Sequence, residues 1–327
     1  MKLLMISTDR RIFDKGSAVA QRQIEYAKRY EEVHIIVFSN KDYMETTIGQ
    51  NIWVYPTRSW NRWMYIFDAL SLARFITEKR GITHVTCQDP FETGLVGSLV
   101  KNRHDVKLEL QVHTDIGSIY FQKFTILNRI RTRISKYTLA RADHVRVVSE
   151  RIKNYVARSV DVSKIEVRPI AIDTSIFQSS ATPIDLHKKY PQFSKIILMV
   201  SRLEREKNIS LALESFKIVL DKIPTVGLVI VGTGNELEYL KQLAVQLRID
   251  KSVIFEGWQD NTTSYYKTAD CFLNTSWYEG YGMTLVEAQS ARLPIVSTDV
   301  GVAREVGAII VGFEKNNIVR GIEEVIS

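Results

Sequence analysis

The sequence predicts an α/β protein made of two doubly wound domains that face a central cleft. Its 327 residues exceed what one hydrophobic core usually organises. Short apolar, strand-like runs alternate with helix-like segments, which is typical of parallel sheets covered by helices on both faces. A non-periodic stretch at residues 171–193, rich in Ser, Thr and Pro, interrupts this alternation as a linker would. We therefore expect two Rossmann-like domains, residues 1–172 and 173–327.

The expected elements follow in chain order. In the first domain, strands at residues 3–6, 33–38, 84–87, 107–112, 144–148 and 165–169 alternate with helices at residues 17–30, 63–79, 92–100, 124–140 and 150–157. In the second, strands at residues 195–200, 227–231, 253–255, 271–274 and 294–298 alternate with helices at residues 209–221, 236–247, 264–268 and 283–290. Ligands of such sheets bind beyond the carboxyl ends of the strands, so the loops after strands should carry the site.

Composition indicates a soluble or peripheral protein of a reducing cytoplasm. No apolar run approaches the about 20 residues that cross a bilayer, and the first apolar run is too short for a secretion signal. Cys87 and Cys271 each lie in a strand-like run of a different half, so we expect core residues rather than a disulfide.

Charge is unevenly distributed along the chain. Residues 1–170 hold 28 Lys and Arg against 18 Asp and Glu, whereas residues 171–327 hold 16 against 19. This asymmetry indicates that the first half meets an anionic surface, whether membrane, nucleic acid or an acidic substrate.

The most informative stretch joins the strand-like run at residues 271–274 to a helix start at Met283. Gly280 and Gly282 lie between them, so a ligand can approach the main chain beside unpaired helical N–H groups, as at anion sites. Glu279 and Glu287 flank the place where a phosphate would lie. Carboxylates bind hydroxyls rather than phosphate, so the pattern favours a ligand with hydroxyls on both sides of its phosphate, such as a nucleotide sugar.

The sequence of residues 279–301, EGYGMTLVEAQSARLPIVSTDVG, resembles the signature of the retaining family 4 glycosyltransferases (glycosyl transferases group 1), which have the GT-B fold. The resemblance implies that Glu287 binds the nucleotide ribose and that Glu279 contacts the donor sugar near the reacting carbon. It also implies that the helix start binds the donor; its residues are Gly282, Met283, Thr284 and Leu285. The alternative is that both glutamates are ordinary solvated residues.

Arg202 and Lys207 follow the strand at residues 195–200 and precede a helix, so we expect them to converge on the cleft opposite the glycine turn. The resembling family uses such a pair to neutralise the diphosphate. A solvated charged loop is the alternative, because Glu204 and Glu206 lie between them. By the same resemblance, Trp258 in the turn after residues 253–255 lies near the nucleotide base.

In the first domain, one position matches the family and another matches it only in part. His113 ends the strand at residues 107–112 and matches the family's histidine beside the donor sugar. Gly16 stands where the family usually has two adjacent glycines near the donor phosphates and the acceptor. A structural histidine and an ordinary helix-entry glycine are the alternatives.

The sequence departs from the family at two further places. Ile170 and Ala171 replace the family's usual Asn-Gly, and the end of the chain also differs. Members usually continue into a final helix that crosses back onto the first domain. Here that helix is expected to be missing, so domain closure is held differently or the sequence is shortened.

With this resemblance, the observations predict a glycosyltransferase (a hexosyltransferase-type activity) that transfers a sugar from a nucleotide diphosphate sugar to a saccharide or lipid-linked acceptor, as in the synthesis of cell-surface glycans or glycolipids. The resemblance implies that the anomeric configuration is retained. No Asp-x-Asp occurs, so we expect neither a metal nor another cofactor. A GT-B nucleotide-sugar epimerase and a non-catalytic nucleotide-sugar binding subunit remain open. A dehydrogenase is disfavoured because no full GxGxxG is present.

Contact with an anionic membrane is a further hypothesis, at the inner face of the membrane. Residues 58–65 mix cations with Trp60 and Trp63, and residues 128–136 form a helix-like stretch rich in Arg and Ile. Partly buried tryptophans and a solvated basic helix are the alternative. Nucleic acid is not expected, because no binding module for it is recognised.

Overall fold

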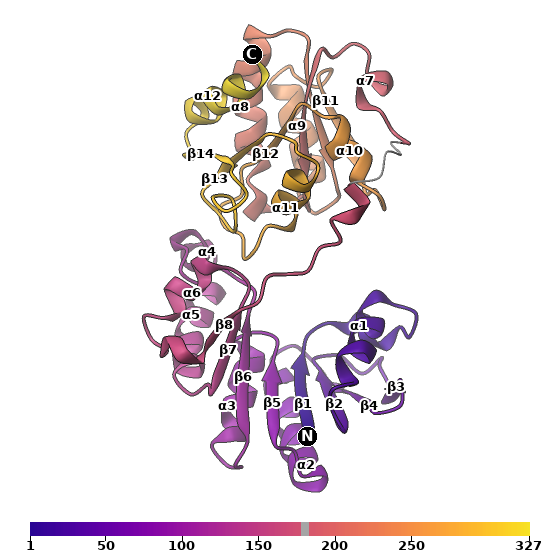
Figure 1. Cartoon of the computed structure of the whole chain (residues 1–327), viewed down its shortest axis with the longest axis vertical. Coiled ribbons are helices and arrows are strands. Elements are labelled where there is room, and N and C mark those ends of the chain that lie inside the picture. The colour runs from indigo at the N-terminus through magenta and orange to yellow at the C-terminus, as the bar shows by residue number, and fades with distance from the viewer. Residues whose placement is uncertain (178–182) are drawn as a thin grey trace. The chain divides into compact units, whose positions relative to one another are not determined.

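The computed structural model of the protein describes residues 1–177 and 183–327. The chain separates into two compact units, Met1–Pro169 (unit 1) and Ile170–Ser327 (unit 2), drawn in Figure 1. This division falls three residues before the expected boundary after residue 172. Residues 178–182 of the expected linker lie outside the described residues. Within the rest of that linker, the chain forms a short 3-10 helix, η3 (Ser175–Phe177), and the helix α7 (Leu186–Lys189).

Unit 1 is built on an eight-stranded sheet, and the structure describes all of its residues. The strand order is β3-β4-β2-β1-β5-β6-β7-β8. Their bounds are β1 (Lys2–Ser7), β2 (Glu32–Val37), β3 (Thr46–Ile48), β4 (Ile52–Pro56), β5 (His84–Cys87), β6 (Lys107–Val112), β7 (His144–Val147) and β8 (Ile165–Val167). All neighbours pair in parallel except β3 and β4, which are antiparallel.

The helices of unit 1 begin largely where the sequence offers capping side chains. Their bounds are η1 (Arg10–Phe13), α1 (Ala18–Ala27), α2 (Tyr65–Arg80), α3 (Glu92–Lys101), α4 (Ile119–Phe124), α5 (Ile126–Leu139), α6 (Glu150–Val156) and η2 (Val162–Lys164). Ser17, Thr125 and Ser149 each accept a hydrogen bond from a backbone N–H of the following helix and so cap α1, α5 and α6.

Two features of unit 1 differ from the sequence-based expectation. The antiparallel pair β3–β4 was not predicted, although Ile48, Ile52 and Val54 are buried and pack against the core formed with β1 and β2. The expected helix at residues 124–140 is preceded by a separate helix, α4. The two helices are divided at Thr125, whose extended backbone (φ −144°) breaks the helix while its hydroxyl caps α5.

The described part of unit 2 contains a six-stranded parallel sheet with the order β11-β10-β9-β12-β13-β14. The strands are β9 (Lys195–Val200), β10 (Val226–Val231), β11 (Val253–Gly257), β12 (Cys271–Asn274), β13 (Ile295–Thr298) and β14 (Ile309–Val311). The further helices are η4 (Arg205–Lys207), α8 (Ile209–Lys222), α9 (Leu237–Gln246), α10 (Thr263–Thr268), α11 (Met283–Ser290) and α12 (Lys315–Ile326). The prediction had omitted β14 and had not assigned α12.

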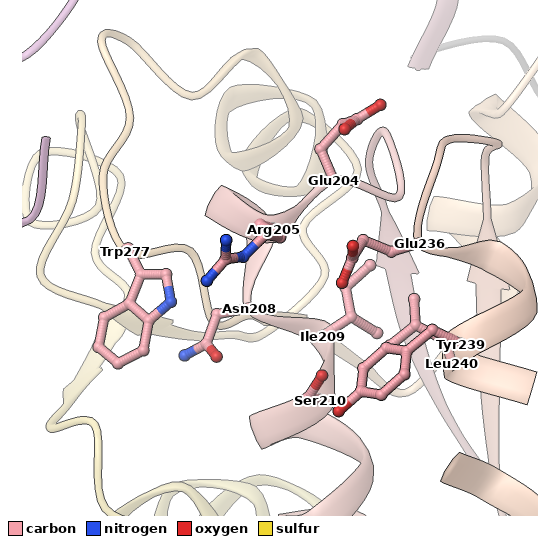
Figure 2. A pocket seen from close by; sticks show the side chains of 9 residues that line it. All are labelled: Glu204, Arg205, Asn208, Ile209, Ser210, Glu236, Tyr239, Leu240 and Trp277. Carbon is pink, nitrogen blue, oxygen red and sulfur yellow. The ribbon is translucent and has the colours of Figure 1, made fainter. Parts of the chain in front are cut away.

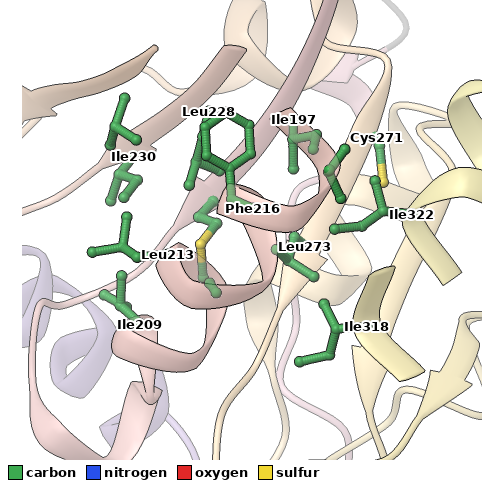
Figure 3. Packing of buried hydrophobic residues seen from close by; sticks show 14 of the residues in the cluster. Ile197, Ile209, Leu213, Phe216, Leu228, Ile230, Cys271, Leu273, Ile318 and Ile322 are labelled. Carbon is green, nitrogen blue, oxygen red and sulfur yellow. The ribbon is translucent and has the colours of Figure 1, made fainter. Parts of the chain in front are cut away.

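Two apolar clusters cover the two faces of this sheet. One packs α8, α9 and α12 against the strands and includes Phe216, Leu228 and Ile322, which are labelled in Figure 3. The other packs α7, α10 and α11 against the opposite face. Helices on both faces of a parallel sheet make unit 2 doubly wound, as predicted.

Both cysteines are buried and free, in agreement with the expected core positions. Among the described residues, no helix is both long enough and apolar enough to cross a membrane.

Candidate active site

The glycine turn before α11 is required by the local backbone. Gly282 has φ +89° and ψ 63° and lies directly before the first residue of α11. A Cβ atom at this position would lie 2.8 Å from Leu285 Cδ1, so another residue would be strained by both its backbone and its side chain. Gly301 packs against the same turn, where a Cβ would lie 2.2 Å from the carbonyl oxygen of Tyr281. The backbone of the turn is therefore restricted to one conformation, and this conformation sets where α11 begins.

Glu279 in this turn is held by two donors. Its Oε1 accepts hydrogen bonds from Lys207 Nζ at 2.5 Å and from Ser276 Oγ at 2.9 Å. The side chains of Lys207 and Glu279 are only 13% and 16% exposed, so the ion pair is screened little by solvent. The structure thus brings together two residues that the sequence placed on separate motifs.

The loop after β9 is tied to the loop after β12 by further bonds that sequence reasoning missed. Thr275 Oγ1 donates to the carbonyl oxygens of Lys207 and Asn208, at 3.1 and 3.0 Å. The amide of Trp277 donates to the carbonyl oxygen of Glu206 at 2.8 Å. These bonds fix Lys207 against the glycine turn. The sequence signal was weak, because Thr275 and Trp277 lie before the recognised motif.

Arg202 occupies the same loop but remains accessible. Its guanidinium donates to Glu206 Oε1 at 3.0 Å, and its side chain is 67% exposed. An exposed guanidinium can exchange this surface ion pair for a more highly charged anion at small cost.

Glu287 lies on α11, half-buried, and its Oε2 accepts a hydrogen bond from Tyr266 OH at 2.7 Å. Tyr266 comes from α10 and is buried. Burial, with the neighbouring Glu287 carboxylate, raises the pKa of Tyr266 well above its ordinary value, so the hydroxyl remains a donor. Sequence analysis did not single out Tyr266, because nothing in its local pattern marks a contact with a residue 21 positions away.

The remaining predicted donor-binding residues of unit 2 differ in how far their side chains are exposed to solvent. At the start of α11, Met283 is exposed and Thr284 is half-buried, whereas the Leu285 side chain is buried in the core and its amide donates to Gly282 O. Contact with a ligand at Leu285 is thus restricted to its backbone. Trp258 follows β11, is 69% exposed, and donates from Nε1 to Asp260. Two strands, β10 and β9, separate β11 from β12 in the sheet.

The predicted residues His113 and Gly16 lie in unit 1. His113 follows β6, and its Nε2 lies 3.2 Å from Gln111 Oε1. Desolvation, with repulsion from Arg146, lowers the pKa of His113, so the ring is uncharged near neutral pH. Gly16 precedes the capping residue of α1 and donates from its amide to Asp14 Oδ1. The structure therefore places these two residues in unit 1 and the other predicted site residues in unit 2.

Among residues 1–177 and 183–327, no group of three or more His, Cys, Asp or Glu side chains is arranged to hold a metal ion.

Two family models match the chain. The model described as "Glycosyl transferases group 1" matches residues 185–326, and the model described as "Glycosyltransferase Family 4" matches residues 23–176. Together they span most of both units.

Curated relatives agree with this assignment. An uncharacterized glycosyltransferase of Methanocaldococcus jannaschii is 27% identical over 55% of the chain, and the alignment covers 41% of that relative. The alpha-monoglucosyldiacylglycerol synthase of Streptococcus pneumoniae is 26% identical over 86% of the chain and 67% of its own length. The N-acetyl-alpha-D-glucosaminyl L-malate synthase of Bacillus anthracis is 24% identical over 89% of the chain and 77% of its own length. The chain thus spans about two fifths to three quarters of these relatives.

Solved structures show the same fold. Sucrose-phosphate synthase from Thermosynechococcus elongatus has a TM-score of 0.81 at 17% identity, over 99% of this chain and 89% of its own. HepE of Anabaena, solved with UDP-glucose, has a TM-score of 0.73 at 16% identity, over 100% of this chain and 90% of its own. With the two matched family models and the doubly wound units, these likenesses confirm the expected family and fold: the chain belongs to the group 1, family 4 glycosyltransferases of the GT-B fold.

Proposed function

We propose that the protein transfers a sugar from a nucleotide diphosphate sugar to an acceptor hydroxyl and retains the anomeric configuration. The observation that carries the proposal is the arrangement around the start of α11. Glu279 and Glu287 flank the Gly282 turn, and Lys207 is fixed against Glu279. In support of the proposal, a carboxylate is suited to sugar or ribose hydroxyls, and a helix N-terminus is suited to phosphate.

In this proposal, each residue has a defined part. Arg202, Lys207 and the N-terminus of α11, with the backbone amides of Met283 and Thr284, stabilise the departing diphosphate by positive charge where negative charge develops. The amide of Leu285 already donates to Gly282 O, so Leu285 takes no direct part in this contact. Glu287, oriented by Tyr266, binds the ribose.

Glu279 and His113 orient the donor sugar, Gly16 admits the diphosphate close to the main chain, and Trp258 lies beside the base. The bond from the anomeric carbon to the diphosphate oxygen breaks while the acceptor oxygen bonds to that carbon from the same face. The acceptor proton passes to the departing phosphate oxygen, so charge is balanced without a covalent intermediate on the protein.

The relatives guide the choice of substrates. The relatives include the alpha-monoglucosyldiacylglycerol synthase and the UDP-Gal:alpha-D-GlcNAc-diphosphoundecaprenol alpha-1,3-galactosyltransferase of Escherichia coli. HepE has been solved with UDP, with UDP and glucose, and with UDP-glucose. We therefore propose a UDP-sugar donor and a saccharide or lipid-linked acceptor, in cell-surface glycan or glycolipid synthesis.

A peripheral position at the cytoplasmic face of a membrane is part of the proposal. Trp60 and Trp63 are 85% and 76% exposed, which contradicts the alternative that they are partly buried. Exposed side chains of α5 include Arg129, Ile130 and Arg133, spaced so that they share one face of the helix. Exposed tryptophans beside cations are suited to the headgroup region of an anionic bilayer.

The test is a thermal-shift screen with UDP, GDP and ADP sugars, followed by a transfer assay with the preferred donor and a panel of saccharide and lipid-linked acceptors. We expect one nucleotide to be preferred and a product with the donor's anomeric configuration. An inverted product would contradict retention. Epimerised donor without acceptor product would favour the epimerase, and donor binding without turnover would favour the non-catalytic subunit.

Metal independence is proposed on the absence of an Asp-x-Asp sequence. EDTA should leave the transfer rate unchanged, and a rate restored only by added manganese or magnesium would contradict this part of the proposal.

A further inference from the structure

Unit 2 contains a cavity of about 550 Å³ that none of the proposed donor contacts lines. Its volume lies within the roughly 300–1,000 Å³ of small-molecule sites. The start of α8, the start of α9 and the loop after β12 form its walls, as Figure 2 shows. The polar and aromatic side chains that line it are Glu204, Arg205, Asn208, Ser210, Glu236, Tyr239 and Trp277.

The lining combines two aromatic rings with several hydrogen-bonding groups. Trp277 and Tyr239 come from different elements, and Tyr239 is 51% exposed, so its ring is available to a ligand. The apolar C–H face of a pyranose ring packs on aromatic rings, while its hydroxyls donate to carboxylates such as Glu204 and Glu236. The cavity therefore fits a saccharide in volume and in the chemistry of its lining.

Charge distinguishes a neutral saccharide from a phosphate. The cavity carries two carboxylates, Glu204 and Glu236, against one guanidinium, Arg205, so the charged side chains sum to one negative charge. Although the helices α8 and α9 begin here, the carboxylates repel an anion at short range. A neutral polyhydroxylated ligand avoids this repulsion and uses the same carboxylates as acceptors.

Asn208 supplies an unused donor. Its backbone is left-handed (φ +51°), and its carbonyl oxygen accepts a hydrogen bond from Thr275 Oγ1, so the residue is held in place. Its Nδ2 atom is buried and has no hydrogen-bond partner among the described residues. Buried donors are normally satisfied, so this atom is suited to a ligand oxygen such as a sugar hydroxyl.

The cavity shares its walls with the candidate active site without using the same side chains. Asn208 follows Lys207 directly, and Trp277 precedes Glu279 by two residues. Lys207 and Glu279 bond to each other and do not line the cavity. We propose that this cavity is a second carbohydrate site, which binds a neutral pyranose unit beside the donor site. The assignment does not depend on the transfer reaction.

Saturation-transfer NMR tests the proposal directly. The probes are methyl α-glucopyranoside, methyl α-galactopyranoside and maltose, each with saturating UDP present, and glucose 6-phosphate serves as the anionic comparison. We expect saturation of the ring C–H protons of at least one neutral probe. Tyr239→Ala should abolish this signal. Glu236→Gln keeps an acceptor oxygen but removes its charge, so it should raise the Kd by about fivefold.

Two control variants make the result specific. Glu238→Gln is the same change on the same helix at an exposed position outside the cavity, and it should bind like the wild type. Glu279→Gln alters the proposed donor-sugar contact and should also keep the signal. Three results would each overturn the proposal. They are the absence of saturation for every neutral probe, wild-type binding by both Tyr239→Ala and Glu236→Gln, and preferential binding of glucose 6-phosphate. Loss of binding in Glu279→Gln alone would assign the signal to the donor site instead, and this too would overturn it.

Steady-state kinetics show whether the bound saccharide is part of the acceptor or a free effector. They use the donor found in the thermal-shift screen. If the site holds part of the acceptor, Tyr239→Ala raises the KM of the saccharide acceptor. If the site holds a free effector, the same variant removes the response of the rate to added sugar. An unchanged acceptor KM together with an unchanged response to added sugar would contradict the proposal.

Discussion

Lys207 and Glu279 form a largely buried ion pair, with Nζ and Oε1 2.5 Å apart, although 72 positions separate them in the chain. The pair joins the loop after β9 to the glycine turn before α11. Removing one partner of such a pair leaves the other charge uncompensated, so substitutions here should change donor binding.

Lys207→Ala and Arg202→Ala should weaken UDP binding far more than UMP binding. Each loses a charged hydrogen bond to the second phosphate, worth about 1.5–3 kcal/mol, or roughly 10- to 150-fold in Kd. Isothermal titration with the two nucleotides measures the difference. Lys217→Ala removes a surface lysine that pairs with Asp221 and should bind both like the wild type. Equal losses for UMP and UDP would refute the diphosphate role.

Glu287→Ala should mainly raise the Kd of the donor, whereas Glu279→Ala should mainly lower kcat. The reason is that the first carboxylate is proposed to hold the ribose and the second the reacting sugar. Tyr266→Phe keeps the buried ring but removes the hydroxyl that orients Glu287, so it should share the Glu287→Ala phenotype in milder form. Titration of the donor in steady-state kinetics separates the two effects. Wild-type rate and affinity in both glutamate variants would show that the motif has been misread.

Gly282→Ala should destabilise unit 2 more than Gly307→Ala does. Both positions have positive φ, which costs a non-glycine residue about 1–2 kcal/mol. Only at Gly282 does the added Cβ also meet a side-chain atom at 2.8 Å, whereas nothing lies within 4 Å of a Cβ at Gly307. Urea denaturation followed by circular dichroism compares the two. If the variants unfold at the same urea concentration, the contact with Leu285 relaxes freely.

Unit 1 should lose stability as the pH falls below about 6.5, in part through His34. The side chain is fully buried between Glu32 and Tyr55 OH, and burial lowers the pKa of His34 below its ordinary value of 6.5, despite the favourable Glu32 carboxylate. Because the unfolded state then binds the proton more readily, its free energy falls relative to the folded state as the pH decreases through 6.5. His34→Gln should flatten this dependence between pH 7 and pH 5, whatever its effect at pH 7. An unchanged slope of the unfolding free energy against pH would contradict the assignment.

Trp60→Ser combined with Trp63→Ser should reduce binding to vesicles, and Arg129→Gln combined with Arg133→Gln should reduce it only when the vesicles are anionic. Each surface cation contributes about 1 kcal/mol against anionic lipid, roughly fivefold in the partition coefficient. Co-sedimentation with anionic and neutral vesicles, at low and physiological salt, separates the two effects. Val245→Ser changes an exposed apolar residue of unit 2 and serves as the control. Absent binding, or equal binding to neutral vesicles, would refute the electrostatic attraction.

Local sequence patterns were sufficient to predict the α/β class, both doubly wound sheets and the position of the glycine turn before Met283. Apolar runs and helical segments are local patterns, and a parallel strand buried on both faces leaves a continuous apolar run that is easily recognised. The sequence-based prediction omitted β4 because this strand lacks such a continuous apolar run. Its residues, Ile52–Pro56, alternate between buried and half-buried, because an edge region of the sheet is covered less completely.

Which polar side chains contact each other depends on the tertiary structure. The Lys207–Glu279 pair and the Tyr266–Glu287 hydrogen bond join residues 72 and 21 positions apart, and no local pattern specifies either partner. The cavity lined by Asn208, Tyr239 and Trp277 likewise exists only where α8, α9 and the loop after β12 approach one another. Hydrophobic periodicity records which face of an element is buried, whereas the pairing of polar side chains depends on how the strand order and crossover connections bring loop ends together in space.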